Sequence, residues 1–152
     1  MIQRIQSVYL FIGVLAICAM LAFPYVRIVD EAATAYMFLH TATGDAGIVN
    51  AYDPLLIMVA GAATALSFLI AIFLYKNRIR QMRFNAIVFV MNCLFIAVIF
   101  FTSDRLAKDL NGRADYKQVG VVMPLISMIM LVFANKAIKK DEMKVRAADR
   151  LR

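Results

Sequence analysis

Tyr75-Lys76-Asn77-Arg78-Ile79-Arg80-Gln81-Met82-Arg83 is a stretch with four cations and no acid, and it separates two long apolar runs. Residues 76–83 are long enough to connect one membrane helix to the next, and they are too few to form a further structural element. Short loops rich in Lys and Arg resist translocation and stay on the cytoplasmic side of a membrane. The sequence therefore predicts a polytopic membrane protein whose central turn is cytoplasmic.

Hydrophobic residues make up 63% of the 152-residue chain, and four uncharged windows carry the excess. Each window meets the requirement of roughly 18 to 20 residues for crossing a hydrocarbon core. A soluble bundle with buried helices is the disfavoured alternative, because so many apolar windows leave too little polar surface for it. We expect an all-α membrane protein, a single domain over residues 1–152 with an up-down bundle of four transmembrane helices. These spans are predicted at about 5–26, 54–75, 84–103 and 118–135, followed by a cytoplasmic helical tail at 136–152.

The net charge of +7 is distributed unevenly along the chain. Twelve cations lie before residue 5, within 76–83 or after 135, whereas five lie in the two segments 27–53 and 102–117. This bias places both termini in the cytoplasm. Orientation and attraction to anionic lipids account for these charges, so a nucleic-acid partner is not expected.

The segments outside the predicted spans give weaker patterns. One interpretation is a short interfacial helix at residues 30–40. The other is a β-hairpin that pairs 36–41 with 47–52 and turns at Gly44 and Gly47. We favour the hairpin. Residues 104–110 predict a separate short helix along the outer surface, with Ser103 as its cap. Pro124 predicts a kink within the fourth span.

Small and amide residues mark the surfaces through which the helices pack. Gly61 and Ala65 are four residues apart in the second span, so one face permits close approach of another backbone. Asn85 and Asn92 are seven residues apart in the third span and share a face. Buried amides commonly form interhelical hydrogen bonds, although a polar residue such as Asn92 can also line a pathway through a membrane.

Recognisable catalytic, nucleotide-binding and metal-binding motifs are missing from the sequence. The predicted spans contain no acidic, basic or histidine side chain, which argues against a pump or an ion-coupled transporter. His40 is the sole histidine and cannot form a metal site alone. We therefore expect a protein that is not an enzyme and has no cofactor or metal.

Three stretches at the predicted cytoplasmic helix ends carry a resemblance. They are the opening Met1-Ile2-Gln3-Arg4-Ile5-Gln6, the turn Leu74-Tyr75-Lys76-Asn77-Arg78 with Gln81, and the tail Ala137-Ile138-Lys139-Lys140-Asp141-Glu142 with Val145-Arg146 and Asp149-Arg150-Leu151-Arg152. Together they resemble a four-helix integral membrane family of unknown function from Bacteroidota. The resemblance spans the whole chain and implies the inner membrane of a Gram-negative cell, but it implies no activity.

The leading hypothesis is a non-enzymatic accessory or scaffold subunit of a larger inner-membrane complex, in protein export or envelope assembly, with a homo-oligomer as the other possible assembly. One alternative is a small lipid-binding or transport protein that uses a groove beside Asn85 and Asn92. Another is a membrane anchor whose basic tail contacts ribosomal RNA. The candidate contacts to a partner or to anionic lipids are Arg4, Lys76, Arg78, Arg80, Arg83, Lys139, Lys140, Arg146, Arg150 and Arg152.

Overall fold

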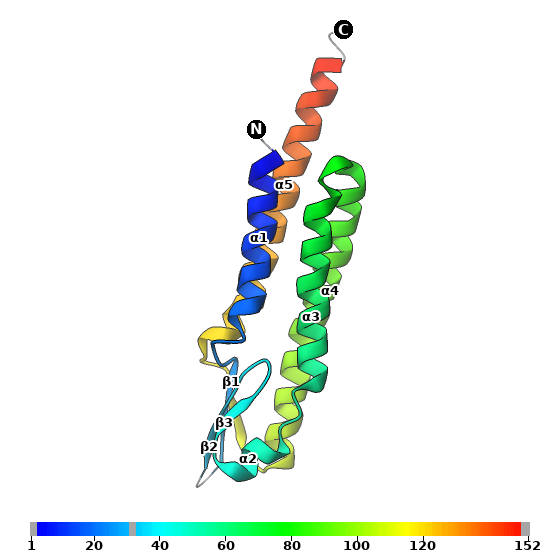
Figure 1. The fold of residues 1–152 in the computed structure, drawn as a ribbon. Coiled ribbons are helices and arrows are strands. Elements are labelled where there is room, and N and C mark those ends of the chain that lie inside the picture. The colour runs from blue at the N-terminus through cyan, green and yellow to red at the C-terminus, as the bar shows by residue number, and fades with distance from the viewer. Residues whose placement is uncertain (1–2, 31–32, 150–152) are drawn as a thin grey trace.

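Four long helices form a ring-shaped antiparallel bundle in the computed structural model, which describes residues 3–30 and 33–149 (Figure 1). They are α1 (Gln3–Ala19), α3 (Leu55–Phe73), α4 (Arg78–Asp109) and α5 (Met123–Asp149). Helix α1 packs against α5 and α3, and α4 packs against α3 and α5. The chain is therefore mostly helical as predicted, but the fold is not all-α, because a four-stranded sheet is added at one end.

Three segments of the described chain are helical, long and apolar enough to cross a membrane: Leu55–Phe73, Arg78–Asp109 and Val119–Lys144. The apolar helix Ile5–Ala19 is shorter. The first predicted span, residues 5–26, therefore ends early, because a turn follows Ala19 and Val26 already belongs to a strand. Pro24 lies in this connection, where its missing N–H breaks no helical hydrogen bond.

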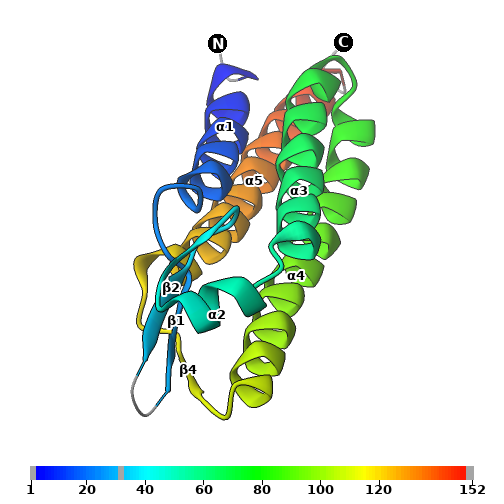
Figure 2. The same cartoon turned by 60° about the horizontal axis from the view of Figure 1, so that its bottom comes forward.

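A four-stranded antiparallel sheet covers the end of the bundle opposite the termini (Figures 1 and 2). Its strands are β1 (Val26–Val29), β2 (Thr34–Met37), β3 (Ala42–Gly44) and β4 (Arg113–Asp115), in the order β3-β2-β1-β4. The strands therefore come from both connections at this end of the bundle. Arg27 lies opposite Asp115 in the register and forms an ion pair with it at 2.9 Å.

The predicted hairpin between 36–41 and 47–52 is wrong in its pairing. β2 pairs with β1 and β3, whereas residues 46–51 form the short helix α2 (Ala46–Ala51). Asp45 begins this helix, since its Oδ1 accepts a hydrogen bond from the Gly47 N–H at 2.9 Å. The segment predicted as the turn of the hairpin therefore contains the N-cap of a helix.

Helix α4 is longer at both ends than the predicted span 84–103. It begins at Arg78 because Asn77 caps it, accepting the Arg80 N–H at 3.1 Å, so most of the predicted turn is helical. The reversal itself takes the 3-10 turn Leu74–Lys76 and Asn77. The predicted separate helix 104–110 is the last part of α4, because the Ser103 hydroxyl bonds to the Ile99 carbonyl within the helix instead of capping a new one.

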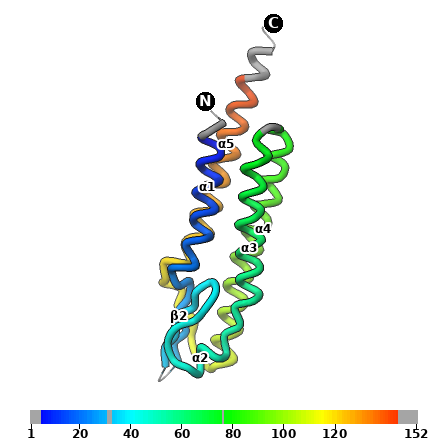
Figure 3. The backbone as a smooth tube through the Cα atoms, in the orientation of Figure 1, coloured from blue at the N-terminus to red at the C-terminus, as the bar shows by residue number. Residues whose placement is uncertain are grey.

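Helix α5 starts later than predicted and contains Pro124 in its first turn. A 3-10 turn, Val119–Val122, precedes it and Met123 is its first residue. At this position a proline removes no intrahelical hydrogen bond, so the predicted kink inside the span is wrong. Helices α1 and α5 run side by side, and α5 extends past the α3–α4 turn (Figures 1 and 3).

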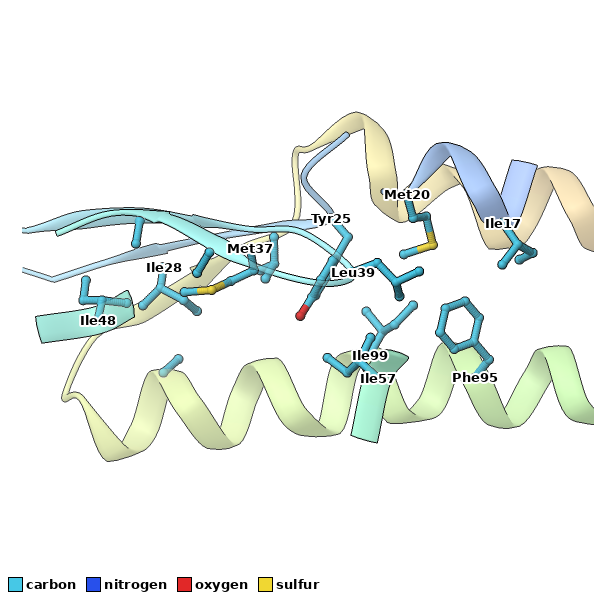
Figure 4. Packing of buried hydrophobic residues seen from close by; sticks show 14 residues of the cluster. Ile17, Met20, Tyr25, Ile28, Met37, Leu39, Ile48, Ile57, Phe95 and Ile99 are labelled. Atoms are coloured by element: carbon cyan, nitrogen blue, oxygen red, sulfur yellow. The ribbon is translucent and has the colours of Figure 1, made fainter. Parts of the chain in front are cut away.

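Two apolar clusters hold the fold together. One lies among the four helices and includes Leu10, Phe68, Val88 and Leu131, all fully buried. The other joins the sheet to the helices, where Tyr25 and Leu39 point toward Phe95 and Ile99 of α4 (Figure 4). Burial of this second cluster holds the sheet and α2 against the helices at that end of the bundle.

A substitution at Gly120 tests how closely the connection into α5 packs against the connection that follows α1. Its N–H donates to the Pro24 carbonyl at 2.9 Å, and a Cβ at this position would lie 2.5 Å from the same oxygen. We expect Gly120→Ala to lower the free energy of unfolding by about 1–3 kcal/mol, because backbone must move to accept the methyl group. Thermal unfolding in detergent, followed by circular dichroism, measures the loss.

Gly47→Ala is the matched control, since Gly47 is exposed and a Cβ there meets nothing closer than Asp45 Oδ1 at 3.2 Å. Equal unfolding midpoints for the two variants would contradict the close seating of Gly120.

Candidate functional site at the basic end of the bundle

The basic end of the bundle is the end formed by the start of α1, the α3–α4 turn and the C-terminal part of α5 from Lys136 onward (Figure 1). Eleven of the chain's seventeen cations lie in the segments 76–83 and 136–152, and Arg4 lies in the first turns of α1. The fold therefore brings the three recognisable stretches of the sequence to one end.

One ion pair joins two of these stretches. Arg78 Nη2 lies 3.0 Å from Asp141 Oδ2, which links the start of α4 to α5. Asp141 is 8% exposed, so its carboxylate depends on Arg78 for its charge partner. Arg78, predicted as a contact to a partner or lipid, forms this ion pair within the chain, and its predicted role stays a prediction.

Four other predicted cations are exposed around this pair: Arg80, Arg83, Lys139 and Lys140. No ion pair is recorded for them within the described part of the chain. For Arg4, Lys76 and Arg146 the structure describes the backbone but not the side chain, and Arg150 and Arg152 lie outside the described residues. Their predicted roles stay predictions.

A groove of ≈ 450 Å³ lies between α1 and α5 at the basic end. Its apolar wall comes from Ile5 and Tyr9 of α1 and from Phe133 of α5, and the Tyr9 and Phe133 ring centroids are 5.8 Å apart. Lysines line its other part, and Lys136 Nζ lies 6.0 Å from the Phe133 ring centroid. The complete lining is Ile5, Tyr9, Phe133, Lys136, Ala137, Lys140, Asp141 and Lys144.

The sequence analysis missed most of this groove, Lys140 being its one predicted residue. A signal was present, since Lys136, Lys140 and Lys144 recur every four residues and therefore share a helix face. The spacing alone gave no indication of the apolar wall, because that wall depends on α1 lying beside α5.

Amide side chains along one face of α4 connect it to its neighbours. Asn92 Nδ2 donates to Ser127 Oγ at 2.9 Å and to the Pro124 carbonyl at 3.0 Å, both on α5. Asn85 Nδ2 donates to Asn135 Oδ1 at 2.7 Å, and Gln81 Nε2 donates to the Ala71 carbonyl of α3 at 2.9 Å. All three amides are fully buried, so Asn85 and Asn92 lie where they can link helices.

Their oxygens have a different environment. Gln81 Oε1, Asn85 Oδ1 and Asn92 Oδ1 are buried and have no hydrogen-bond partner among the described residues. Each amide therefore uses its donor across a helix interface while retaining acceptor capacity inside the bundle.

Gly61 and Ala65 lie on the inner side of α3. Gly61 is buried, and a Cβ there would lie 3.1 Å from Leu39 Cδ1 and 3.3 Å from Phe95 Cε2. Ala65 is half-buried and packs on the cluster below the sheet. The small face of α3 therefore packs within the chain in this structure.

A second cavity, of ≈ 360 Å³, lies at the sheet end, beside Tyr25, Tyr52 and Ser103. The two tyrosine hydroxyls are 3.1 Å apart, and the Tyr52 hydroxyl donates to the Phe38 carbonyl at 2.7 Å. Burial raises the pKa of Tyr25 far above its usual value, and the neighbouring Tyr52 adds to the rise. These hydroxyls are neutral donors at physiological pH and fasten α2 and the sheet together.

The described residues contain no group of three or more His, Cys, Asp or Glu side chains placed to hold a metal ion. Cys18 and Cys93 are free and exposed. At the basic end, exposed cations lie beside an apolar surface, a combination that suits an anionic or amphipathic ligand.

Comparison with known proteins gives one family. Residues 2–151 match the family described as a domain of unknown function (DUF4293). No curated protein and no solved structure matches the chain.

The Arg78–Asp141 pair leads to a prediction about stability. Arg78→Gln leaves the buried Asp141 carboxylate without its cation, so we expect the free energy of unfolding to fall by about 1–3 kcal/mol. Arg80→Gln removes the same charge from an exposed position and should change it by less than about 0.5 kcal/mol. Chemical unfolding in detergent compares the two, and equal effects would show that the pair contributes nothing.

Asn92 gives a second prediction. Asn92→Leu removes both hydrogen bonds to α5, and we expect a loss of about 0.6–2 kcal/mol in stability. Val90→Leu, at an exposed position on the same helix, is the control. An Asn92→Leu protein that unfolds at the wild-type midpoint would show that this amide is not an interhelical link.

Proposed function

The chain belongs to the DUF4293 family of unknown function, and on that premise we propose that it is a non-enzymatic accessory or scaffold subunit of a larger inner-membrane complex. The proposed setting is the inner membrane of a Gram-negative cell, with protein export or envelope assembly as the process served. The resemblance of its helix-end motifs to a family from Bacteroidota supports this setting.

We propose that all four long helices cross the membrane, with both termini in the cytoplasm. The 17 residues of α1 measure about 25 Å, and the turn after Ala19 extends them toward the roughly 30 Å of a hydrocarbon core. The 32 residues of α4 measure about 48 Å, so its last turns project with the sheet beyond the outer surface. The excess of cations at the basic end supports this orientation.

One observation carries the proposal of a protein partner. The Arg78–Asp141 pair joins the start of α4 to α5, so Arg80 and Arg83 lie at the same end of the bundle as Lys139 and Lys140. Topology requires the charges to be on one side but not to be fixed relative to one another. A fixed set of exposed cations offers a defined surface to acidic side chains of a partner.

The projecting part of α5 supports the same proposal. It continues past the α3–α4 turn (Figure 1). Met143, in the C-terminal part of α5, is 56% exposed and has charged neighbours in sequence. A flexible apolar side chain in such a place suits contact with a protein. The exposed residues proposed to form this surface are therefore Arg80, Arg83, Lys139 and Met143.

A second candidate function is the binding or transport of a lipid or small molecule between the helices. The observation that favours it is the set of buried amide oxygens on α4 without partners among the described residues. Asn92→Leu separates the two proposals, since it should abolish such an activity and leave a complex with a partner intact.

The test of the accessory role removes charge without altering topology. Arg80→Gln/Arg83→Gln/Lys139→Gln keeps Arg78 and therefore the ion pair to Asp141. We expect this triple variant to insert normally but to lose at least about tenfold of any protein that co-purifies with the wild-type chain from native membranes in mild detergent, since each rim charge contributes about 0.5–1 kcal/mol. Mass spectrometry quantifies the loss.

Lys108→Gln/Arg113→Gln/Lys117→Gln removes three exposed cations from the sheet end and serves as the control. A wild-type chain that purifies alone under several mild conditions, or equal loss of partner in both triple variants, would contradict the proposal.

A further inference from the structure

We propose that the groove between α1 and α5 is a binding site for a single anionic phospholipid, with the phosphate at Lys136, Lys140 and Lys144 and an acyl chain along Ile5, Tyr9 and Phe133. The inference rests on the proposed embedding in a membrane, but not on the existence of a protein partner.

The cationic part of the groove fits a phosphate. Lys136, Lys140 and Lys144 are exposed and all line the groove, so three ammonium groups on flexible stems can converge on one anion. The groove also contains the carboxylate of Asp141, which would repel an anion if it were free. Arg78 lies 3.0 Å from that carboxylate and offsets its charge, so the net charge facing a ligand is positive.

The apolar part of the groove fits a hydrocarbon chain. Ile5 is 50% exposed and Phe133 is 42% exposed, which is costly in water but favourable against lipid. Ile12, seven residues after Ile5, and Ile129, four residues before Phe133, are exposed as well. Helical spacing places them on the same faces farther from the basic end, so the apolar surface continues toward the middle of the bundle.

The apolar part and the cationic part of the groove follow one another along the helix axes, and this order favours a lipid over an acidic protein segment as the ligand. Phe133, Lys136, Lys140 and Lys144 succeed one another on α5, so the groove changes from apolar to cationic in the direction that leads out of the bundle. A phospholipid changes from acyl chain to phosphate in that same direction. An acidic peptide would use the lysines and leave Ile5 and Phe133 uncovered.

The binding experiment uses the full chain in a neutral detergent. Phosphatidylglycerol or phosphatidylcholine is titrated in, and native mass spectrometry counts the bound lipids. We expect one phosphatidylglycerol to bind tightly and phosphatidylcholine to bind at least about tenfold more weakly. Because each lysine near an anionic headgroup contributes about fivefold, Lys136→Gln/Lys140→Gln/Lys144→Gln should weaken phosphatidylglycerol binding about 100-fold.

Arg80→Gln/Arg83→Gln/Lys139→Gln removes the same number of charges from the same end but outside the groove. It should retain the lipid, which separates a localised site from a diffuse electrostatic attraction. Equal weakening by both triple variants, equal binding of the two lipids, or displacement of the lipid by millimolar inorganic phosphate alone would each overturn the proposal.

The same two variants keep this proposal separate from the accessory role. A variant that loses lipid but retains a co-purifying protein indicates a lipid site independent of the complex. A groove variant that binds lipid normally while losing the protein would overturn the lipid site and leave the accessory role standing.

Discussion

The four helices must find a fixed alignment although their outer faces are as apolar as their inner faces. Leu55, Leu66, Val90 and Leu94, for example, are each more than half exposed. In a lipid environment apolar contact alone does not distinguish one helix interface from another. Hydrogen bonds between polar groups on different helices then set the alignment of the helices. Gln81, Asn85 and Asn92 serve this purpose at three levels of α4, through one hydrogen bond to α3 and three to α5.

The two ends of the bundle are held in different ways. At the sheet end, backbone hydrogen bonds between four strands, a buried apolar cluster and the Tyr25–Tyr52 contact all act together. At the basic end the Arg78–Asp141 pair joins α4 to α5, and exposed cations surround it. Repeated contacts fix the sheet end more firmly, whereas the basic end presents charged groups that a ligand can reach.

How far the sequence predicts this structure depends on the range of the interactions involved. The apolar windows predict α3, α4 and α5, because length and hydropathy are local properties, and the spacing of Asn85 and Asn92 predicts their common face. The strand pairing was not predictable in the same way, since β1 joins Arg113–Asp115 from the other connection. Likewise, the charged segment 104–109 is polar enough to leave a membrane and still continues α4. The groove required knowledge that α1 lies beside α5, which no local pattern contains.

The placement of β4 also orders the events of synthesis. Val29 and its partner Arg113 are made at times separated by about 4 to 17 seconds of translation. Throughout that interval β1 has one open edge, a row of backbone donors and acceptors that another chain could pair with. β4 can add to the sheet only after the last turns of α4 have been made and the chain has turned back. A nascent chain stalled before residue 113 therefore lacks the strand that covers this edge of β1.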